Sequence, residues 1–138
     1  MAEVTATDDV ALSADKVWSV IGDFSGIRKW AVLVQAETTE QTSEGPVRTL
    51  TMPDGRQVRE LLVRQDAHSY TYSLDRPDMT EYASTVAVVP RDRDASQIKL
   101  TIHYGLRDES AAAETAERLQ KNLRGNIKAM KKALGIAV

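Results

Sequence analysis

The spacing of apolar residues changes along the chain, and these changes divide the sequence into three regions. In the first region, residues 3–11 alternate loosely and predict a strand. A helical spacing follows, and Ser13 is placed to cap that helix. Ser25-Gly26 predicts a break, after which residues 27–30 predict a second short helix. The apolar stripe of the first helix consists of Val17, Trp18, Ile21 and Phe24.

The middle region, residues 33–104, has the pattern of strands joined by turns. Runs of apolar and β-branched residues are separated by short segments that contain Gly, Pro or Asp. Because such short connections join neighbouring strands directly, these strands should pair antiparallel. We place six strands near 33–42, 46–53, 56–65, 69–76, 82–90 and 96–104.

The last region contains the clearest helix, near residues 109–134, and Gly135 is placed to end it. Acidic residues lead this helix and basic residues close it, which complements the helix dipole. Its apolar stripe needs a large surface to cover, and the sheet is the candidate. The order therefore predicts an α+β fold (β-α-α-β6-α), with one curved antiparallel sheet of about seven strands wrapped around the terminal helix. The stripe consists of Ala112, Ala116, Leu119, Leu123, Ile127, Met130 and Leu134.

One turn fixes the pairing of two central strands. In Pro53-Asp54-Gly55, proline pre-sets φ and glycine tolerates positive φ, which predicts a three-residue hairpin loop with a bulge. This loop places Leu50 opposite Val58 and Arg48 opposite Glu60. Paired residues share a face, so a charge pair is expected among apolar side chains. Such a pair gains little in a filled core, and a hollow, partly hydrated sheet face tolerates it better.

The neighbouring strands extend this apolar face. A three-residue turn at 66–68 would place Tyr72 opposite Leu62 and Leu74 opposite Glu60. Tyr82 shares a face with Val86 and Val88 on the next strand, and Ile102 lies on the apolar face of the last strand with Ile98, Leu100 and Tyr104.

Composition and charge narrow the function classes. The 138 residues suit one domain, residues 1–138, with 42% apolar and 28% charged residues. The net charge of −2 gives no sign of a nucleic-acid partner. The absence of cysteine excludes disulfides and thiolate zinc sites. We see no signal peptide or membrane span, so we expect a cytoplasmic protein without stable membrane insertion.

Candidate chemistry is sparse. His68 falls in a turn and His103 on the polar face of the last strand, and both are expected to be solvated. Two separated histidines without cysteine make no metal signature, and no phosphate-binding glycine loop is present. The expectation is therefore no metal and no cofactor.

Several short motifs accompany this element order. They are Val17-Trp18, Phe24, Trp30, Gly45, Val47-Arg48, Asp54-Gly55, Val58, Glu60-Leu61, Tyr72 and Tyr82. Together with the element order, these motifs resemble the START-like superfamily (SRPBCC), in its small bacterial polyketide cyclase/dehydrase-like branch. This resemblance implies a helix-grip fold, in which the sheet and the long helix enclose a pocket for a mostly apolar small molecule. It also implies that loops near 53–55 and 76–80 gate the mouth of the pocket.

The predicted pocket residues combine this resemblance with the apolar faces described above. Arg48 and Glu60 either bind the polar end of a ligand or pair only with each other across the hairpin. Tyr72 and Tyr82 either offer hydroxyls to a ligand or only pack. Trp30 either lines the entrance or caps the core under the short helices. The set is Trp30, Arg48, Leu50, Val58, Glu60, Leu62, Tyr72, Tyr82, Ile102, Leu119 and Leu123.

Three functions are compatible with such a pocket. The first is binding of a hydrophobic small molecule that is lipid-like, aromatic or polyketide-like. The second is a polyketide cyclase, aromatase or dehydratase in which Glu60 acts as general acid or base and Tyr72 or Tyr82 stabilises an enolate. The third is a ligand-gated protein-interaction module whose protein partner the sequence does not identify.

Overall fold

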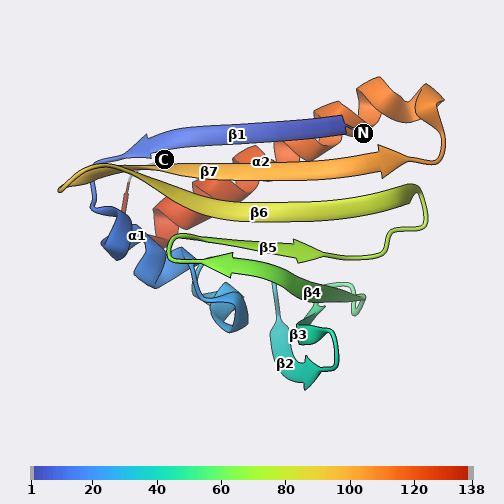
Figure 1. Ribbon diagram of the computed structural model, residues 1–138, viewed down its shortest axis with the longest axis horizontal. Coiled ribbons are helices and arrows are strands. Elements are labelled where there is room, and N and C mark those ends of the chain that lie inside the picture. Colours follow the sequence, from blue (N-terminus) through green and yellow to red (C-terminus); the bar gives the residue numbers. More distant parts are fainter. Residues whose placement is uncertain (1, 137–138) are drawn as a thin grey trace.

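Residues 2–136 are described by a computed structural model (Figure 1). Residues 1, 137 and 138 of the expected domain lie outside the described part of the chain. The elements are β1 (Ala2–Val10), α1 (Ala14–Ile21), the 3₁₀ helix η1 (Phe24–Lys29), β2 (Ala36–Thr42), β3 (Gly45–Thr51), β4 (Gln57–Asp66), β5 (Ser69–Ser73), β6 (Met79–Asp92), β7 (Ala95–Leu106), the 3₁₀ helix η2 (Glu109–Ala111) and α2 (Ala112–Ala133).

Seven strands form one antiparallel sheet in the order β1-β7-β6-β5-β4-β3-β2. Helix α2 lies across one face of this sheet and packs mainly on β1 and β7 (Figure 1). Helix α1 contacts β6 and β7, and η1 contacts β2 at the opposite edge of the sheet. This arrangement confirms the predicted α+β helix-grip fold. Because α2 covers the β1–β7 half, space remains between the helix and the β3–β5 half.

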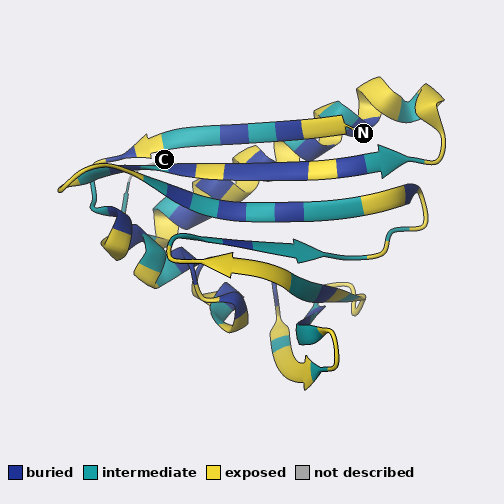
Figure 2. Ribbon diagram, in the orientation of Figure 1, coloured by how far each residue is buried: buried dark blue, intermediate teal, exposed yellow. Residues whose placement is uncertain are grey.

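The apolar face of the sheet is also the buried face. Buried positions alternate along β7 and recur along α2 (Figure 2), as expected where the two elements pack on each other. The core cluster joins this face to α1 and η1 through Val17, Ile21 and Phe24. His103 lies on the outer face of β7 with a half-exposed side chain 3.3 Å from Glu3.

Local signals set the start of α1 and the end of α2. The Ser13 hydroxyl accepts a hydrogen bond from the Lys16 amide at 3.2 Å, which confirms Ser13 as the N-cap of α1. At the other end of the chain, Gly135 has a φ of 79° and its amide donates to the Lys132 carbonyl at 3.0 Å. The left-handed glycine therefore ends α2 as predicted.

Several predicted boundaries differ from those observed. The strand predicted from residue 33 begins at Ala36, because residues 30–34 form a turn that packs against η1 and the inner face. The second short helix begins at Phe24, so the predicted break at Gly26 is a kink inside η1. Strands β6 and β7 extend beyond their predicted ends, and the first turn of the long helix is the separate 3₁₀ helix η2.

The first central hairpin has the predicted turn and register. The Gly55 amide donates to the Met52 carbonyl at 2.9 Å, and Gly55 has a φ of 83°. Across β3 and β4, Leu50 pairs with Val58 and Arg48 pairs with Glu60. The charge pair therefore faces inward, as the turn chemistry predicted.

The β4–β5 hairpin reaches the predicted pairing by a different route. Asp66 pairs with Ser69, so the turn contains two residues and not the predicted three. A register shift at Val63 then adds one residue to β4, and Leu62 still pairs with Tyr72. The side chain at the shift, Val63, is more than half exposed. The shorter turn and the bulge cancel, so Tyr72 keeps its predicted partner and face. The prediction for Leu74 is wrong: β5 ends at Ser73, so Leu74 does not pair with Glu60 and lines a hollow outside the inner cavity.

Candidate functional site

Arg48 is the centre of a buried polar cluster on the inner face of β3. Its Nε donates to Oε1 of Glu60 at 2.7 Å, and its Nη1 donates to the Phe24 carbonyl at 2.8 Å. Nη1 also lies 3.4 Å from the Tyr70 hydroxyl. The guanidinium carbon sits 4.3 Å from the centroid of the Phe24 ring and 4.8 Å from that of Tyr72. With 1% of its surface exposed, the arginine is held by an acid, a carbonyl and three aromatic rings.

Glu60 carries the compensating charge and is 6% exposed. Burial raises the pKa of its carboxyl group above the usual value, and the attraction of Arg48 offsets part of this rise. At the polar end of the inner face, the protein therefore holds a carboxyl group that is easier to protonate than one on the surface.

Two tyrosines flank this pair. Burial is the largest cause that raises the pKa of Tyr72 well above its usual value, and the nearby Glu60 charge adds to it. Burial also raises the pKa of Tyr82, against the opposing effect of Arg76. Both hydroxyls consequently stay protonated at neutral pH and are able to donate hydrogen bonds. Ser84, which pairs with Tyr72 across the ladder, adds a third hydroxyl.

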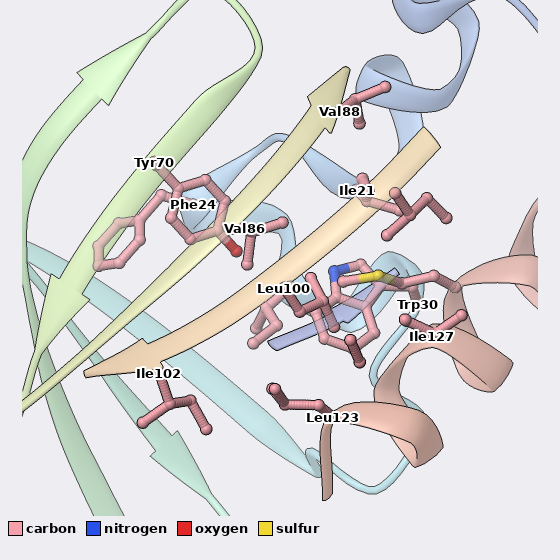
Figure 3. Close-up of a cluster of buried hydrophobic side chains, with 14 of the residues drawn as sticks. Ile21, Phe24, Trp30, Tyr70, Val86, Val88, Leu100, Ile102, Leu123 and Ile127 are labelled. Carbon is pink, nitrogen blue, oxygen red and sulfur yellow. The ribbon is translucent and has the colours of Figure 1, made fainter. Parts of the chain in front are cut away.

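A cavity of about 520 Å³ lies between the inner face of the sheet, the 30–34 turn and α2. Its walls combine the Arg48–Glu60 pair with apolar side chains of η1, the sheet and α2. Its apolar wall residues include Ile27, Leu50, Met52, Val58, Val86, Leu100, Ile102, Leu123 and Met130. Figure 3 shows Leu100, Ile102 and Leu123 within the core cluster that forms the deep part of this wall.

Most of the residues expected around a pocket line this cavity. They are Trp30, Arg48, Leu50, Val58, Glu60, Tyr72, Tyr82, Ile102 and Leu123. Leu62 and Leu119 lie elsewhere. Leu62 packs against the edge of the core, and Leu119 is buried in it where α2 meets the sheet.

Trp30 combines the two positions that the sequence left open. It is 4% exposed within the core cluster (Figure 3), and it also lines the cavity. It is the C-cap of η1, and its backbone amide donates to the Ile27 carbonyl at 3.2 Å. Its buried indole Nε1 has no hydrogen-bond partner within residues 2–136.

The prediction missed Tyr70 and Ser84. Tyr70 is fully buried, contacts Arg48 through its hydroxyl and packs edge-on against Phe24, with ring centroids 5.7 Å apart. The alternation of side chains along a strand could have identified both residues. Tyr70 lies two positions from Tyr72, and Ser84 lies two positions from Tyr82, so each shares a face with a predicted pocket residue.

The mouth of the cavity differs from the one that the resemblance implied. The exposed lining residues come from the 30–34 turn and from α2, with Val32 80% and Leu33 66% exposed. Opposite them, Asn122, Gly125 and Asn126 are also exposed. The lining contains no residue of the 53–55 or 76–80 loops among those that the structure describes. The opening therefore lies between the turn and the helix.

A second hollow, of about 830 Å³, lies on the other face of the sheet next to the β5–β6 loop. Charged side chains of both signs line it, namely Glu44, Arg56, Arg59, Asp75, Arg76 and Asp78. Removing these groups from water would be costly, so this hollow is less suited to an apolar molecule than the inner cavity.

The described residues contain no cluster of three histidine, cysteine, aspartate or glutamate side chains that could hold a metal ion. His68, expected to be solvated, is half-buried: its Nε2 lies 2.8 Å from Asp15, and its ring packs edge-on against Trp18. Within residues 2–136 we find no helix with the length and apolar character that a membrane crossing requires.

The family of this chain follows from a match over nearly its whole length. Residues 1–135 match the family model described as polyketide cyclase / dehydrase and lipid transport, and the chain belongs to this family. Family membership and fold together indicate small-molecule binding or a cyclase role. A comparison with curated protein sequences gives no significant match.

Solved structures share the fold. A protein from Bacillus thuringiensis has 26% sequence identity and a TM-score of 0.78, with 96% of this chain and 98% of that chain covered. The di-domain ARO/CYC BexL from the BE-7585A biosynthetic pathway has 14% identity and a TM-score of 0.84, with 98% of this chain and 47% of that chain covered. Norcoclaurine synthase from Thalictrum flavum, in complex with dopamine and hydroxybenzaldehyde, has 20% identity and a TM-score of 0.70, with 96% and 83% covered.

Proposed function

We propose that this protein binds a hydrophobic small molecule, lipid-like, aromatic or polyketide-like, in the cavity between the sheet and α2. The observation that carries the proposal is the cavity itself, about 520 Å³ of space with apolar walls and a polar end. Ligand sites in proteins are typically concave, mostly apolar and about 300–1,000 Å³ in volume, with a few placed polar groups. The family description, which includes lipid transport, supports the same class of function.

The walls suggest how affinity and orientation would be divided. Burial of apolar ligand surface against Leu50, Ile102 and Leu123 would supply most of the affinity, at roughly 25 cal/mol per Å². The hydroxyls of Tyr72 and Tyr82 would orient a polar group of the ligand. Residues 2–136 would act together as one ligand-binding domain that needs no cofactor, with the small molecule as its partner.

Gly125 offers a test that separates ligand binding from folding. It lies at the mouth of the cavity, and a Cβ added there would meet no atom within 4 Å. Gly125→Phe should therefore place a ring over the opening without disturbing the helix. Gly125→Ala is the matched control, since it removes the same glycine but adds only a methyl group.

We expect both variants to be as stable as the parent protein or more so, because a helical glycine costs about 1 kcal/mol relative to alanine. Titration with 2-acetylnaphthalene, followed by calorimetry, should show weaker binding to Gly125→Phe and unchanged binding to Gly125→Ala. Equal affinity in all three proteins, or no binding to any of them, would contradict the proposal.

A cyclase or dehydratase activity in the same cavity is the second candidate, and the buried carboxyl of Glu60 favours it. A carboxyl group whose pKa is raised by burial is better matched to proton transfer near neutral pH. Tyr72 and Tyr82 would donate hydrogen bonds to a developing enolate.

Hydrogen–deuterium exchange at the methyl group of 2-acetylnaphthalene measures this chemistry directly. The protein should accelerate the exchange, and Glu60→Gln should abolish the acceleration while the ligand still binds. Acceleration that survives Glu60→Gln unchanged would remove the carboxyl group from the mechanism.

A further inference from the structure

We propose that the cavity selects a neutral apolar molecule that carries a hydrogen-bond acceptor oxygen, and that the indole Nε1 of Trp30 donates to this oxygen. The inference rests on the proposed binding function and names the class of ligand. It is carried by two features of the cavity wall: a buried donor without a partner among the described residues, and a charge pair whose two charges balance each other.

The first feature is the indole of Trp30. Buried polar groups in proteins are nearly always hydrogen-bonded, and each exception calls for an explanation. The Nε1 atom is buried and lacks a partner within the described chain, on a side chain that forms part of the cavity wall. Its location is fixed, because the residue caps η1 and its side chain belongs to the buried core cluster (Figure 3). The donor is therefore preorganised for an acceptor that enters the cavity.

The second feature is the absence of an unbalanced charge in the deep part of the cavity. Arg48 directs Nε to Glu60 and Nη1 to the Phe24 carbonyl and the Tyr70 hydroxyl, and the Glu60 carboxylate balances its charge. The remaining charged residue of the lining is Lys121, which is exposed at the mouth. A carboxylate or phosphate taken inside would lose its hydration beside an arginine whose charge Glu60 already balances, and would add a net negative charge to the cavity. The cavity thus favours neutral ligands over fatty-acid-like anions.

The unpaired donor makes the acceptor selective. In the free protein the indole N–H of Trp30 is buried without a partner among the described residues. A ligand with a carbonyl or ether oxygen supplies the missing hydrogen bond, whereas a hydrocarbon of the same shape leaves the indole N–H unpaired. The ketone therefore gains a hydrogen bond that the hydrocarbon cannot make, and the two ligands are discriminated.

Three naphthalene probes of similar shape isolate the hydrogen bond: 2-acetylnaphthalene has an acceptor, 2-isopropylnaphthalene has none, and 2-naphthoate is an anion. Affinities are measured for the parent protein, for Trp30→Phe, and for Trp18→Phe as the matched control. Trp18 packs on His68 and Tyr70 and is not part of the cavity lining. Comparing the ratio of ketone to hydrocarbon affinity between proteins cancels the different water solubilities of the two probes.

We expect Trp30→Phe to lower the ketone-to-hydrocarbon affinity ratio by about 5- to 10-fold, as expected for one hydrogen bond to a buried donor. Trp18→Phe should leave the ratio unchanged. Naphthoate should bind at least about tenfold more weakly than the ketone, because its carboxylate loses hydration in a cavity whose arginine charge is already balanced by Glu60. An unchanged ratio in Trp30→Phe, or naphthoate binding as tightly as the ketone, overturns the inference.

The parent protein provides a second readout that does not depend on a variant folding. It contains two tryptophans, so its indole N–H signals are resolved by ¹H–¹⁵N NMR and assigned with the single substitutions. The Trp30 signal should lie further downfield in the ketone complex than in the hydrocarbon complex, while the Trp18 signal coincides in both. Binding of both probes with identical Trp30 shifts defeats this inference alone. Failure of both neutral probes to bind defeats the proposed function as well.

Discussion

Removing the positive charge at position 48 should destabilise the protein more than any surface charge change. Arg48→Met keeps a long side chain but removes the partner of Glu60 and the donor to the Phe24 carbonyl. Breaking a buried pair on one side typically costs about 3–5 kcal/mol, because the remaining charge stays buried without compensation. A domain is stable by about 5–15 kcal/mol in total, so the variant should fold but with a much smaller margin.

The loss should depend on pH with a definite sign. The folded-state pKa of Glu60 is raised above its unfolded value, mainly by burial, and removing Arg48 would raise it further. A raised folded-state pKa contributes stability that is fully present below the unfolded pKa and is lost as the pH rises through the folded pKa. Arg48→Met should therefore lose the most stability near pH 7 and markedly less near about pH 4, where Glu60 is protonated.

Urea unfolding, followed by far-ultraviolet circular dichroism at both pH values, measures these differences through shifts in midpoint at constant slope. Arg59→Met is the matched control, since its partner Glu40 lies 3.6 Å away and both side chains are exposed. That surface pair should contribute no more than about 1 kcal/mol. Replacing the second member too, in Arg48→Met with Glu60→Leu, should recover most of the loss. A cost below about 1 kcal/mol for Arg48→Met, or an equal cost at both pH values, would show that the buried pair does not stabilise the fold in this way.

Three further substitutions test individual contacts by urea unfolding. Tyr70→Phe removes the hydroxyl that lies 3.4 Å from Arg48 and should cost about 0.5–1.5 kcal/mol; no loss would mean that the contact contributes nothing. Ser13→Ala removes the N-cap of α1 and should cost about 1 kcal/mol, whereas Ser19→Ala, in the exposed part of the same helix, should change less. Gly55→Ala places a Cβ at a φ of 83° and should cost about 1–2 kcal/mol; an unchanged midpoint would contradict the turn assignment.

The sequence predicted the central part of the site because turn chemistry sets register. Pro53, Asp54 and Gly55 allow a small number of hairpin geometries, and one of them brings Arg48 opposite Glu60. Side-chain alternation then places every second residue of both strands on the inner face. Local backbone preferences were therefore sufficient to bring together two residues that lie twelve positions apart.

Features that depend on tertiary packing were not accessible in the same way. A two-residue turn with a bulge at Val63 and a three-residue turn without one give the same pairing of Leu62 with Tyr72, so the pattern could not distinguish them. The 30–34 turn has no hydrophobic period, and its position follows from contacts with η1 and the sheet. For this reason the sequence left the place of Trp30 undecided and did not locate the mouth of the cavity.

The two residues predicted for the pocket that do not line the cavity show the limit of face assignments. Leu62 and Leu119 lie on the expected apolar faces. At their positions along β4 and α2, however, they pack against other core residues and do not border the cavity. A face pattern gives the direction of a side chain, whereas the volume left between two layers depends on where the helix crosses the sheet.

Binding in the inner cavity can be measured by an isotope-filtered NMR experiment on the complex with 2-acetylnaphthalene, which reports the protein methyl groups in contact with the ligand. We expect contacts with the methyl groups of Leu50, Ile102 and Leu123, which line the inner cavity. Contacts with Val47, Leu61 and Leu74, which line the outer hollow, would contradict it, and so would a saturated sample without contacts to the inner set.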